Sequence, residues 1–133
     1  MQTVLRLRLD DLQLTSLGFA KIDVEGHEMD LLDGAMATIE RCHPRLLVEC
    51  DARTGSHPGD VLGRLGPLGY EGWFLHRGDL APVADFDVGL HQGQRKEFGR
   101  PRPDGLVMNF MFLPSTETTP VVQALRGLIG GSP

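Results

Sequence analysis

Two short apolar segments that each end in acidic residues constrain the fold of this chain more than any other feature. Residues 19–24 and 45–50 have the length and apolar content of buried strands. The stretch between them repeats apolar residues every three or four positions, at Met29, Leu32, Ala35, Met36 and Ile39. A strand, an amphipathic helix and a second strand in this order predict two parallel strands joined by a helical crossover. We expect the second strand to be covered on both faces, because its apolar run is nearly continuous.

Other segments extend this pattern in both directions. Residues 3–9 alternate apolar and polar side chains, which predicts a half-buried strand, and Asp10 and Asp11 are expected to cap a short helical turn after it. After residue 50 we expect a helix over residues 60–68, capped by Asp60 and closed by Gly69, and then a strand over residues 70–75. A tight turn at residues 77–79 leads into a strand over residues 80–83. The last predicted elements are a strand over residues 107–113 and a terminal helix over residues 121–129.

The expected architecture is an α/β sheet with a parallel core and an antiparallel edge strand. A loop, not a helix, joins the last two predicted strands, so we expect these two to pair antiparallel. A chain of 133 residues fits a single domain. Residues 86–104 are rich in Gly, Pro, Arg and Gln and predict a long loop, and residues 130–133 predict a flexible tail.

Composition excludes several classes of protein. The net charge of -5 disfavours a nucleic-acid partner, which would require a basic surface. Cys42 and Cys50 have neither the spacing of a zinc site nor the number of a disulfide framework. The first residues lack the apolar core of a signal peptide, and we find no apolar run of membrane-spanning length. We therefore expect a cytoplasmic protein without a membrane or nucleic-acid partner.

The candidate site lies where the two central strands end. Asp23 and Glu25 follow the first strand, and Glu49 and Asp51 follow the second. Residues two apart on a strand share a face, so each pair is expected to project together. In open α/β sheets ligands bind beyond the carboxyl ends of the strands. Carboxylates there can act as a general base, bind a divalent metal, or accept hydrogen bonds from a hydroxyl group.

A purely structural role competes with this interpretation, and the balance differs between residues. Glu28 and Asp30 lie in the first turn of the predicted helix and are interpreted as helix-start acids without further role. Asp23 and Glu25 favour a function, because a charge inside an apolar strand end is costly. For Glu49 both alternatives stay open. His27 adds an imidazole group to this set, but a solvated histidine at a helix start is common.

The motifs along the first half resemble those of one enzyme family. Leu-Asp-Asp-Leu at residues 9–12 precedes Lys-Ile-Asp-Val-Glu-Gly-His-Glu at residues 21–28. Leu-Asp-Gly-Ala at residues 32–35 and Pro-Arg-Leu-Leu-Val-Glu at residues 44–49 follow. This set is similar to the FkbM-type methyltransferases. The resemblance implies a Rossmann-like methyltransferase sheet, with a final antiparallel strand inserted near one edge.

The resemblance also implies a reaction and roles for the candidate residues. The reaction is methyl transfer from S-adenosylmethionine to a small-molecule acceptor, usually a hydroxyl group of a sugar or natural product. Asp23 and Glu25 are the implied catalytic residues, with Asp23 the better candidate for the base, and Asp23 would also contact the cofactor. Glu49, His27 and Asp51 are the implied acceptor-binding residues. Related sugar O-methyltransferases bind magnesium through acids at this strand end, which makes Asp23 and Glu49 candidate ligands.

One family element has no counterpart in these residues. Family members have a glycine-rich turn after their first strand, and the chain holds no such turn ahead of Thr3 or after a later predicted strand. We therefore expect a C-terminal, acceptor-side half of a methyltransferase domain that works with an N-terminal half. The alternative is a non-catalytic protein that pairs with another chain, including a second copy of itself, through an exposed sheet edge. A metal-dependent hydrolase that uses the same acids is a third, weaker interpretation.

Overall fold

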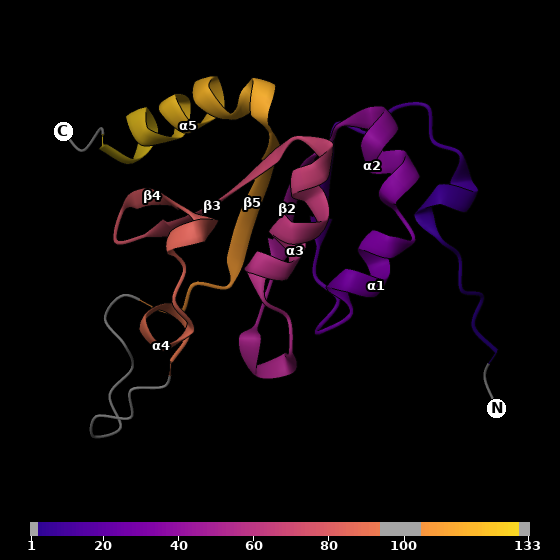
Figure 1. The fold of residues 1–133 in the computed structure, drawn as a ribbon, viewed down its shortest axis with the longest axis horizontal. Coiled ribbons are helices and arrows are strands. Elements are labelled where there is room, and N and C mark those ends of the chain that lie inside the picture. The colour runs from indigo at the N-terminus through magenta and orange to yellow at the C-terminus, as the bar shows by residue number, and fades with distance from the viewer. Residues whose placement is uncertain (1–2, 94–104, 131–133) are drawn as a thin grey trace.

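The computed structural model describes residues 3–93 and 105–130. Within them, one mixed sheet contains five strands in the order β1-β2-β5-β3-β4 (Figure 1). The strands are β1 (Phe19–Ile22), β2 (Arg45–Glu49), β3 (Tyr70–His76), β4 (Asp79–Pro82) and β5 (Asn109–Pro114). The α-helices are α1 (Glu28–Asp33), α2 (Met36–Cys42), α3 (Pro58–Leu65), α4 (Val88–His91) and α5 (Ser115–Gly130). The α/β class is thus confirmed, and the sheet is consistent with part of a Rossmann-like methyltransferase fold.

The strand directions place three carboxyl ends at one edge of the sheet. β1 and β2 are parallel, and β5 is antiparallel to both β2 and β3. β3 therefore runs in the same direction as β1 and β2. The final strand is antiparallel, as the resemblance implies, and it lies between β2 and β3. The rim at the ends of β1 and β2 is the position where α/β sheets bind ligands.

The predicted pairing of the last two strands is wrong. β4 pairs with β3 in a hairpin, and β5 lies on the other side of β3. The hairpin turn explains this difference, since Arg77 and Gly78 both have a left-handed backbone, with φ of 52° and 79°. Two such residues form the turn that matches the twist of two antiparallel strands, so β3 closes onto β4 locally. β4 is the antiparallel edge strand.

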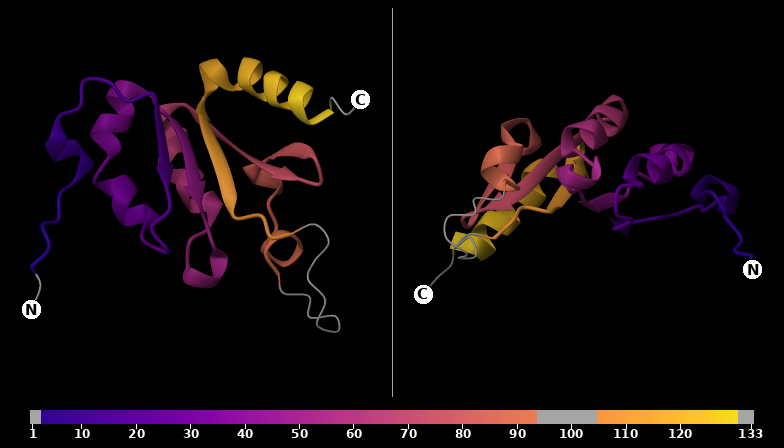
Figure 2. Two further views of the ribbon diagram at one scale, coloured as in Figure 1. Left: turned by 180° about the vertical axis from the view of Figure 1, so that it is seen from behind. Right: turned by 90° about the horizontal axis from the view of Figure 1, so that it is seen from below.

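Helices cover the two faces of the sheet unequally. α1, α2 and α3 pack on one face, over a core that includes Ile22, Leu32, Ile39, Leu46, Val48, Val61, Phe74, Phe110 and Phe112. α5 packs on the opposite face, and its Val122 is buried with Leu80 and Leu113 (Figure 2, right). α5 contacts β3, β4 and β5 but does not extend over β1.

The apolar run of β2 predicted a strand buried on both faces, but only one face of β2 is buried. Leu46 and Val48 are buried beneath the helices, whereas Arg45 is exposed and Leu47 and Glu49 are half-buried. The strand follows an alternating pattern because only one of its faces meets a helical layer. The other face of β2 carries Arg45, Leu47 and Glu49, and Glu49 lies at the rim.

The predicted strand over residues 3–9 is also wrong. Residues 3–8 belong to no strand, and Val4 and Leu5 are 81% and 80% exposed. An alternating sequence fits the surface of a sheet but does not supply a neighbouring strand for its backbone groups. In the described structure this segment leads instead into a 3-10 turn, η1 (Leu9–Leu12).

The predicted central helix exists but is broken into α1 and α2 at Gly34 and Ala35. The backbone N–H of Asp10 donates to the carbonyl of Gly34 at 2.9 Å. The Asp10 carboxylate then accepts from the backbone N–H groups of Ala37 and Thr38, at 3.3 and 2.8 Å. Asp10 therefore caps α2, not η1, the turn in which it lies. Asp11 does cap that turn, since its carboxylate accepts from the N–H of Arg8 at 3.2 Å.

The remaining predictions are mostly confirmed, with shifted boundaries. The strands β1, β2, β3 and β5 and the terminal helix are present, although α5 begins at Ser115. α3 begins before the predicted cap Asp60, because the ring of His57 accepts from the N–H of Gly59 at 3.0 Å. The short helix α4 lies within the predicted loop, and the rest of that loop, residues 94–104, lies outside the described residues. So do residues 131–133 of the predicted tail. None of the helices in the described ranges is both long and apolar enough to cross a membrane.

Candidate functional site

Asp23 lies at the carboxyl end of β1 on the face that the helices leave open. Its side chain is 43% exposed, and its carboxylate pairs with the ammonium of Lys21 at 3.0 Å. The hydrogen bond and charge of Asp23, opposed by slight desolvation and aided by the charge of Glu49, raise the pKa of Lys21. The expectation that Asp23 is buried in an apolar strand end is wrong, because β1 ends at Ile22 and Asp23 faces solvent.

Glu25 lies in a tight left-handed turn that separates β1 from α1. Its φ is 47° and that of Gly26 is 92°. The strand has already ended, so Asp23 and Glu25 do not share a strand face as predicted. Gly26 approaches the next loop closely, and a Cβ at this position would lie 3.1 Å from the carbonyl oxygen of Thr54. The Glu25 carboxylate is exposed and makes no hydrogen bond or ion pair with another described residue.

Glu28, interpreted from the sequence as a helix-start acid, is the buried carboxylate of this region. It is 2% exposed, and its Oε1 accepts from the N–H of Gly26 at 3.1 Å. Its Oε2 is buried without a hydrogen-bond partner among the described residues. Glu28 thereby holds the turn that carries Glu25. Acids in the first turn of a helix are commonly exposed. Here the left-handed turn at Glu25 and Gly26 directs the Glu28 side chain into the protein.

Glu49 ends β2, in the middle of the rim. It pairs in register with Asn109 of β5 and is half-buried. Its carboxylate makes no hydrogen bond or ion pair within the described part of the chain, but its charge contributes to the raised pKa of Lys21. Asp23, Lys21 and Glu49 therefore form one electrostatic group on the open face.

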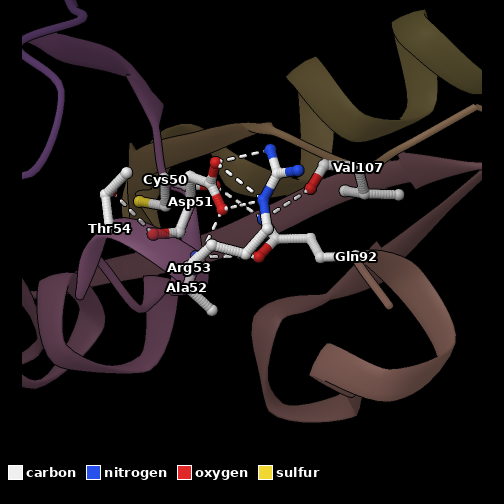
Figure 3. A network of polar contacts seen from close by, with 7 residues as sticks. All are labelled: Cys50, Asp51, Ala52, Arg53, Thr54, Gln92 and Val107. Atoms are coloured by element: carbon white, nitrogen blue, oxygen red, sulfur yellow. Dashed lines mark hydrogen bonds and ion pairs between the residues drawn. The ribbon is translucent and has the colours of Figure 1, made fainter. Parts of the chain in front are cut away.

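Asp51 is engaged by Arg53 within the loop that follows β2 (Figure 3). Both Asp51 carboxylate oxygens accept from the Arg53 guanidinium, at 2.6 to 3.0 Å, and the Arg53 backbone N–H donates to Oδ1 at 2.9 Å. These hydrogen bonds lower the pKa of Asp51 and outweigh the opposing desolvation. No motif in the sequence pointed to Arg53, whose guanidinium is the more exposed group of this pair.

His27 and the histidine-rich surroundings of α4 differ in character. The His27 side chain is 75% exposed, and among the described residues it forms an ion pair with Asp30 alone, at 3.3 Å between Nδ1 and Oδ2. His91 is 4% exposed and stacks on Phe86, with ring centroids 5.3 Å apart. His27 therefore lies at the surface, at the start of α1, whereas His91 is buried.

The thiol of Cys50 lies directly beneath the rim. Burial raises its pKa to about 12, although the Ser56 hydroxyl lowers it. Cys42 and Cys50 are both free thiols. A thiol with such a high pKa stays protonated near neutral pH and is a poor nucleophile.

Magnesium does not fit the rim as it stands. The described residues contain no group of three or more His, Cys, Asp or Glu side chains arranged to hold a metal ion. One candidate ligand, Asp23, is already paired with the ammonium group of Lys21. The other, Glu49, does not belong to any described cluster of three potential metal ligands. Magnesium prefers a nearly octahedral set of oxygen ligands.

Comparison with known proteins identifies the family. The model of the methyltransferase FkbM domain matches residues 2–71, which include β1, α1, α2, β2 and α3. Comparison with curated proteins and with solved structures returned no match. The family match covers the motif at residues 21–28 and both rim segments, and it ends at the start of β3. The chain therefore belongs to the FkbM methyltransferase domain family, whose reaction uses S-adenosylmethionine as the methyl donor.

Proposed function

We propose that this chain lines the acceptor side of an O-methyltransferase site, which transfers a methyl group to a hydroxyl of a sugar or natural product. The observation that carries the proposal is the pair of uncommitted carboxylates, Glu25 and Glu49, at the carboxyl ends of β1 and β2. The other rim carboxylates are engaged, Asp23 by Lys21 and Asp51 by Arg53. A free carboxylate at this edge is available to accept the proton or a hydrogen bond of an acceptor hydroxyl.

The proposed chemistry assigns the proton to this chain. S-adenosylmethionine supplies a methyl carbon bonded to a positively charged sulfur. Attack of the acceptor oxygen on that carbon would release S-adenosylhomocysteine, and the Glu25 carboxylate would take the hydroxyl proton. The resemblance favours Asp23 as the base, but we assign the role to Glu25, because the Asp23 carboxylate already accepts a hydrogen bond from the Lys21 ammonium at 3.0 Å.

The other rim residues orient the acceptor in this proposal. Glu49 accepts from a second hydroxyl group, and Arg53, held by Asp51, donates to an acceptor oxygen. Asp23, on the open face, is the residue proposed to border the methyl donor. His27 lies furthest out and would contact only a large acceptor.

The test is methyl transfer from S-adenosylmethionine labelled in the methyl group to a panel of sugar and polyketide hydroxyl acceptors. We expect Glu25→Gln to lower kcat by about 10²- to 10⁴-fold, the usual contribution of a general base. Asp23→Asn is expected to raise the apparent KM for the methyl donor. Glu40→Gln, which changes an exposed carboxylate on α2, is the control and should leave turnover unchanged.

Circular dichroism must show that each variant is folded. Unchanged turnover in both Glu25→Gln and Asp23→Asn would refute the site assignment. Titration calorimetry with S-adenosylmethionine on this chain separates donor binding from the chemical step.

A specific observation also favours a second candidate, pairing between two copies of the chain. β1 is hydrogen-bonded to a described strand on one side only. A cavity of about 330 Å³ lies beside it, lined mostly by apolar side chains that include Leu12, Leu17 and Ile39. Residues 3–9 have the alternation of a strand but no partner strand, so the segment of a second copy fits the free edge of β1.

Light scattering tests this pairing. We expect the mean mass to rise with concentration, and the double variant Val4→Lys and Leu5→Lys to remain monomeric. A concentration-independent monomer would exclude the pairing.

A further inference from the structure

Gln92 is a buried polar side chain outside the residues that match the family model. It follows α4 and is 1% exposed. Its amide makes three hydrogen bonds that connect two separate segments (Figure 3). Oε1 accepts from the N–H of Ala52 at 2.9 Å, and Nε2 donates to the carbonyls of Cys50 and Val107 at 2.6 and 2.8 Å.

These contacts require an amide. The site presents one N–H and two carbonyl groups, and a glutamine side chain has one acceptor oxygen and two N–H donors on the same planar group. A carboxylate would oppose the two carbonyls, and an aliphatic side chain would leave all three backbone groups unpaired. A buried backbone group left without a partner destabilises the fold, so the amide is the side-chain group that this site requires.

The backbone around Gln92 is itself fixed. Its N–H donates to the carbonyl of Val88 at 2.9 Å, and the carbonyl of His91 accepts from Val107 at 3.0 Å. A Cβ on the next residue, Gly93, would lie 2.2 Å from the carbonyl oxygen of Gly89, so a glycine is needed there. Gln92 is therefore anchored on α4 and reaches the rim as a rigid support.

The group that Gln92 supports is the loop that carries the Asp51–Arg53 pair. Cys50 and Ala52, the residues on either side of Asp51, are the ones whose backbone the amide binds. Asp51 in turn holds the Arg53 guanidinium at 2.6 Å. We propose that Gln92 is a positioning residue, which fixes the direction in which Asp51 and Arg53 face the acceptor. This inference rests on the proposed function only for the identity of what binds there.

Nuclear magnetic resonance of the isotopically labelled chain tests the positioning directly. We expect Gln92→Met, which keeps the side-chain length, to move the Ala52 amide proton upfield and to displace the Arg53 Nε–H resonance. Exchange of the Ala52 amide should quicken by about five- to tenfold, the effect of one lost hydrogen bond. Resonances of Ile22 in β1 should stay in place. Gln123→Met, an exposed glutamine on α5, is the matched control.

A second variant keeps the test decisive if Gln92→Met does not fold. Gln92→Glu retains the acceptor for Ala52 but loses both donors, so the carbonyl ¹³C resonances of Cys50 and Val107 should shift while the Ala52 amide does not. Its stability deficit should shrink at low pH, where the introduced carboxyl gains a proton that it can donate. Unchanged Ala52 and Arg53 resonances in Gln92→Met, or unchanged carbonyl resonances in Gln92→Glu, would overturn the proposal.

The transfer assay then separates the two proposals. With a productive acceptor, Gln92→Met should raise the acceptor KM about tenfold, which corresponds to about 1.4 kcal/mol, with kcat nearly unchanged. An unchanged KM beside shifted Arg53 resonances would overturn the role of Gln92 in facing the acceptor. If no acceptor is methylated even when the wild-type chain is assayed together with a half-domain that binds S-adenosylmethionine, the proposed function fails, while the resonance shifts still decide whether Gln92 positions the pair.

Discussion

Individual carboxylates at the rim differ more in their surroundings than their places in the sequence indicate. Asp23, expected inside the strand end, is exposed, whereas Glu28, interpreted as a helix-start acid without further role, is 2% exposed. The exchange follows from the left-handed turn at Glu25 and Gly26, which redirects the chain between them. Non-glycine residues adopt such a backbone rarely, so a strand or helix pattern does not predict it.

Removal of the Glu28 carboxylate should destabilise the fold. Glu28→Ala leaves the Gly26 N–H without its acceptor and is expected to lower the free energy of unfolding by about 1–3 kcal/mol. Glu28→Gln keeps an acceptor oxygen and should lose less. Urea unfolding measures both, with the exposed Glu40→Ala as the control. Equal losses in Glu28→Ala and Glu40→Ala would contradict the role of the buried carboxylate.

At the scale of elements, helices and strands of this chain are completed by residues far away in the sequence. The N-cap residue of α2, Ala35, has no side chain that can cap the helix. Asp10 caps it instead, by accepting from the N–H groups of Ala37 and Thr38, which are 27 and 28 positions later in the sequence. Local patterns therefore predicted that helical residues lie between β1 and β2, but not that the helix breaks. They predicted β1, β2, β3 and β5 because an apolar run of strand length is a local property. The strand over residues 3–9 failed because pairing is not local.

The cap provided by Asp10 should be visible in stability against pH. Desolvation opposes the shift, but the hydrogen bonds from Thr38 and Ala37 and the charge of Arg8 lower the pKa of Asp10 below 3.8. The contribution is therefore complete above pH 3.8 and is lost as the pH falls through the folded-state pKa. Asp10→Ala should cost about 0.5–2 kcal/mol at pH 7 and progressively less in acid.

Urea unfolding of wild type and Asp10→Ala across pH measures this difference. Asp11→Ala, which removes an exposed bond to Arg8, is the neighbouring control and should have a smaller effect. A difference between wild type and Asp10→Ala that stays constant down to pH 2 would argue against the cap.

Two glycines in neighbouring elements should respond in opposite directions to the same substitution. A Cβ on Gly72 of β3 would lie 2.8 Å from both Phe112 and Val83, so Gly72→Ala should destabilise by about 1–3 kcal/mol. Gly63 of α3 is exposed with no atom within 4 Å of its Cβ position, so Gly63→Ala should stabilise the helix by about 0.5–1 kcal/mol. Thermal unfolding measures both, and a shift of Tm in the same direction for both variants would contradict the packing described.

For the whole molecule, the last strand in sequence holds the sheet together. β5 lies between β2 and β3, and its Phe110 and Phe112 are fully buried in the main core. The resemblance predicted a final antiparallel strand near one edge of the sheet, and β5 is antiparallel but lies at the centre of the five described strands. Its partners could not be inferred from apolar runs, because β5 could equally have paired with β4. The same limit applies to Gln92, whose three partners meet only in the folded sheet.

A chain that ends at residue 105 should lose cooperative folding. It retains the family-matched residues 2–71 but lacks β5 and α5, so β2 and β3 have no shared neighbour. We expect no sharp thermal transition and no fixed aromatic signal in near-ultraviolet circular dichroism. A cooperative transition in this shortened chain would show that the helical face alone stabilises β1 and β2.

The position of β5 also bears on how the protein is made. During synthesis β2 and β3 leave the ribosome before the strand that separates them, so each has an unpaired edge until the C-terminal part emerges. Exposed edges of this kind recruit strands from other chains. The interval between the synthesis of β3 and that of β5 is therefore the period when the nascent chain depends most on chaperones. Slow translation of the segment between these strands would lengthen that exposure.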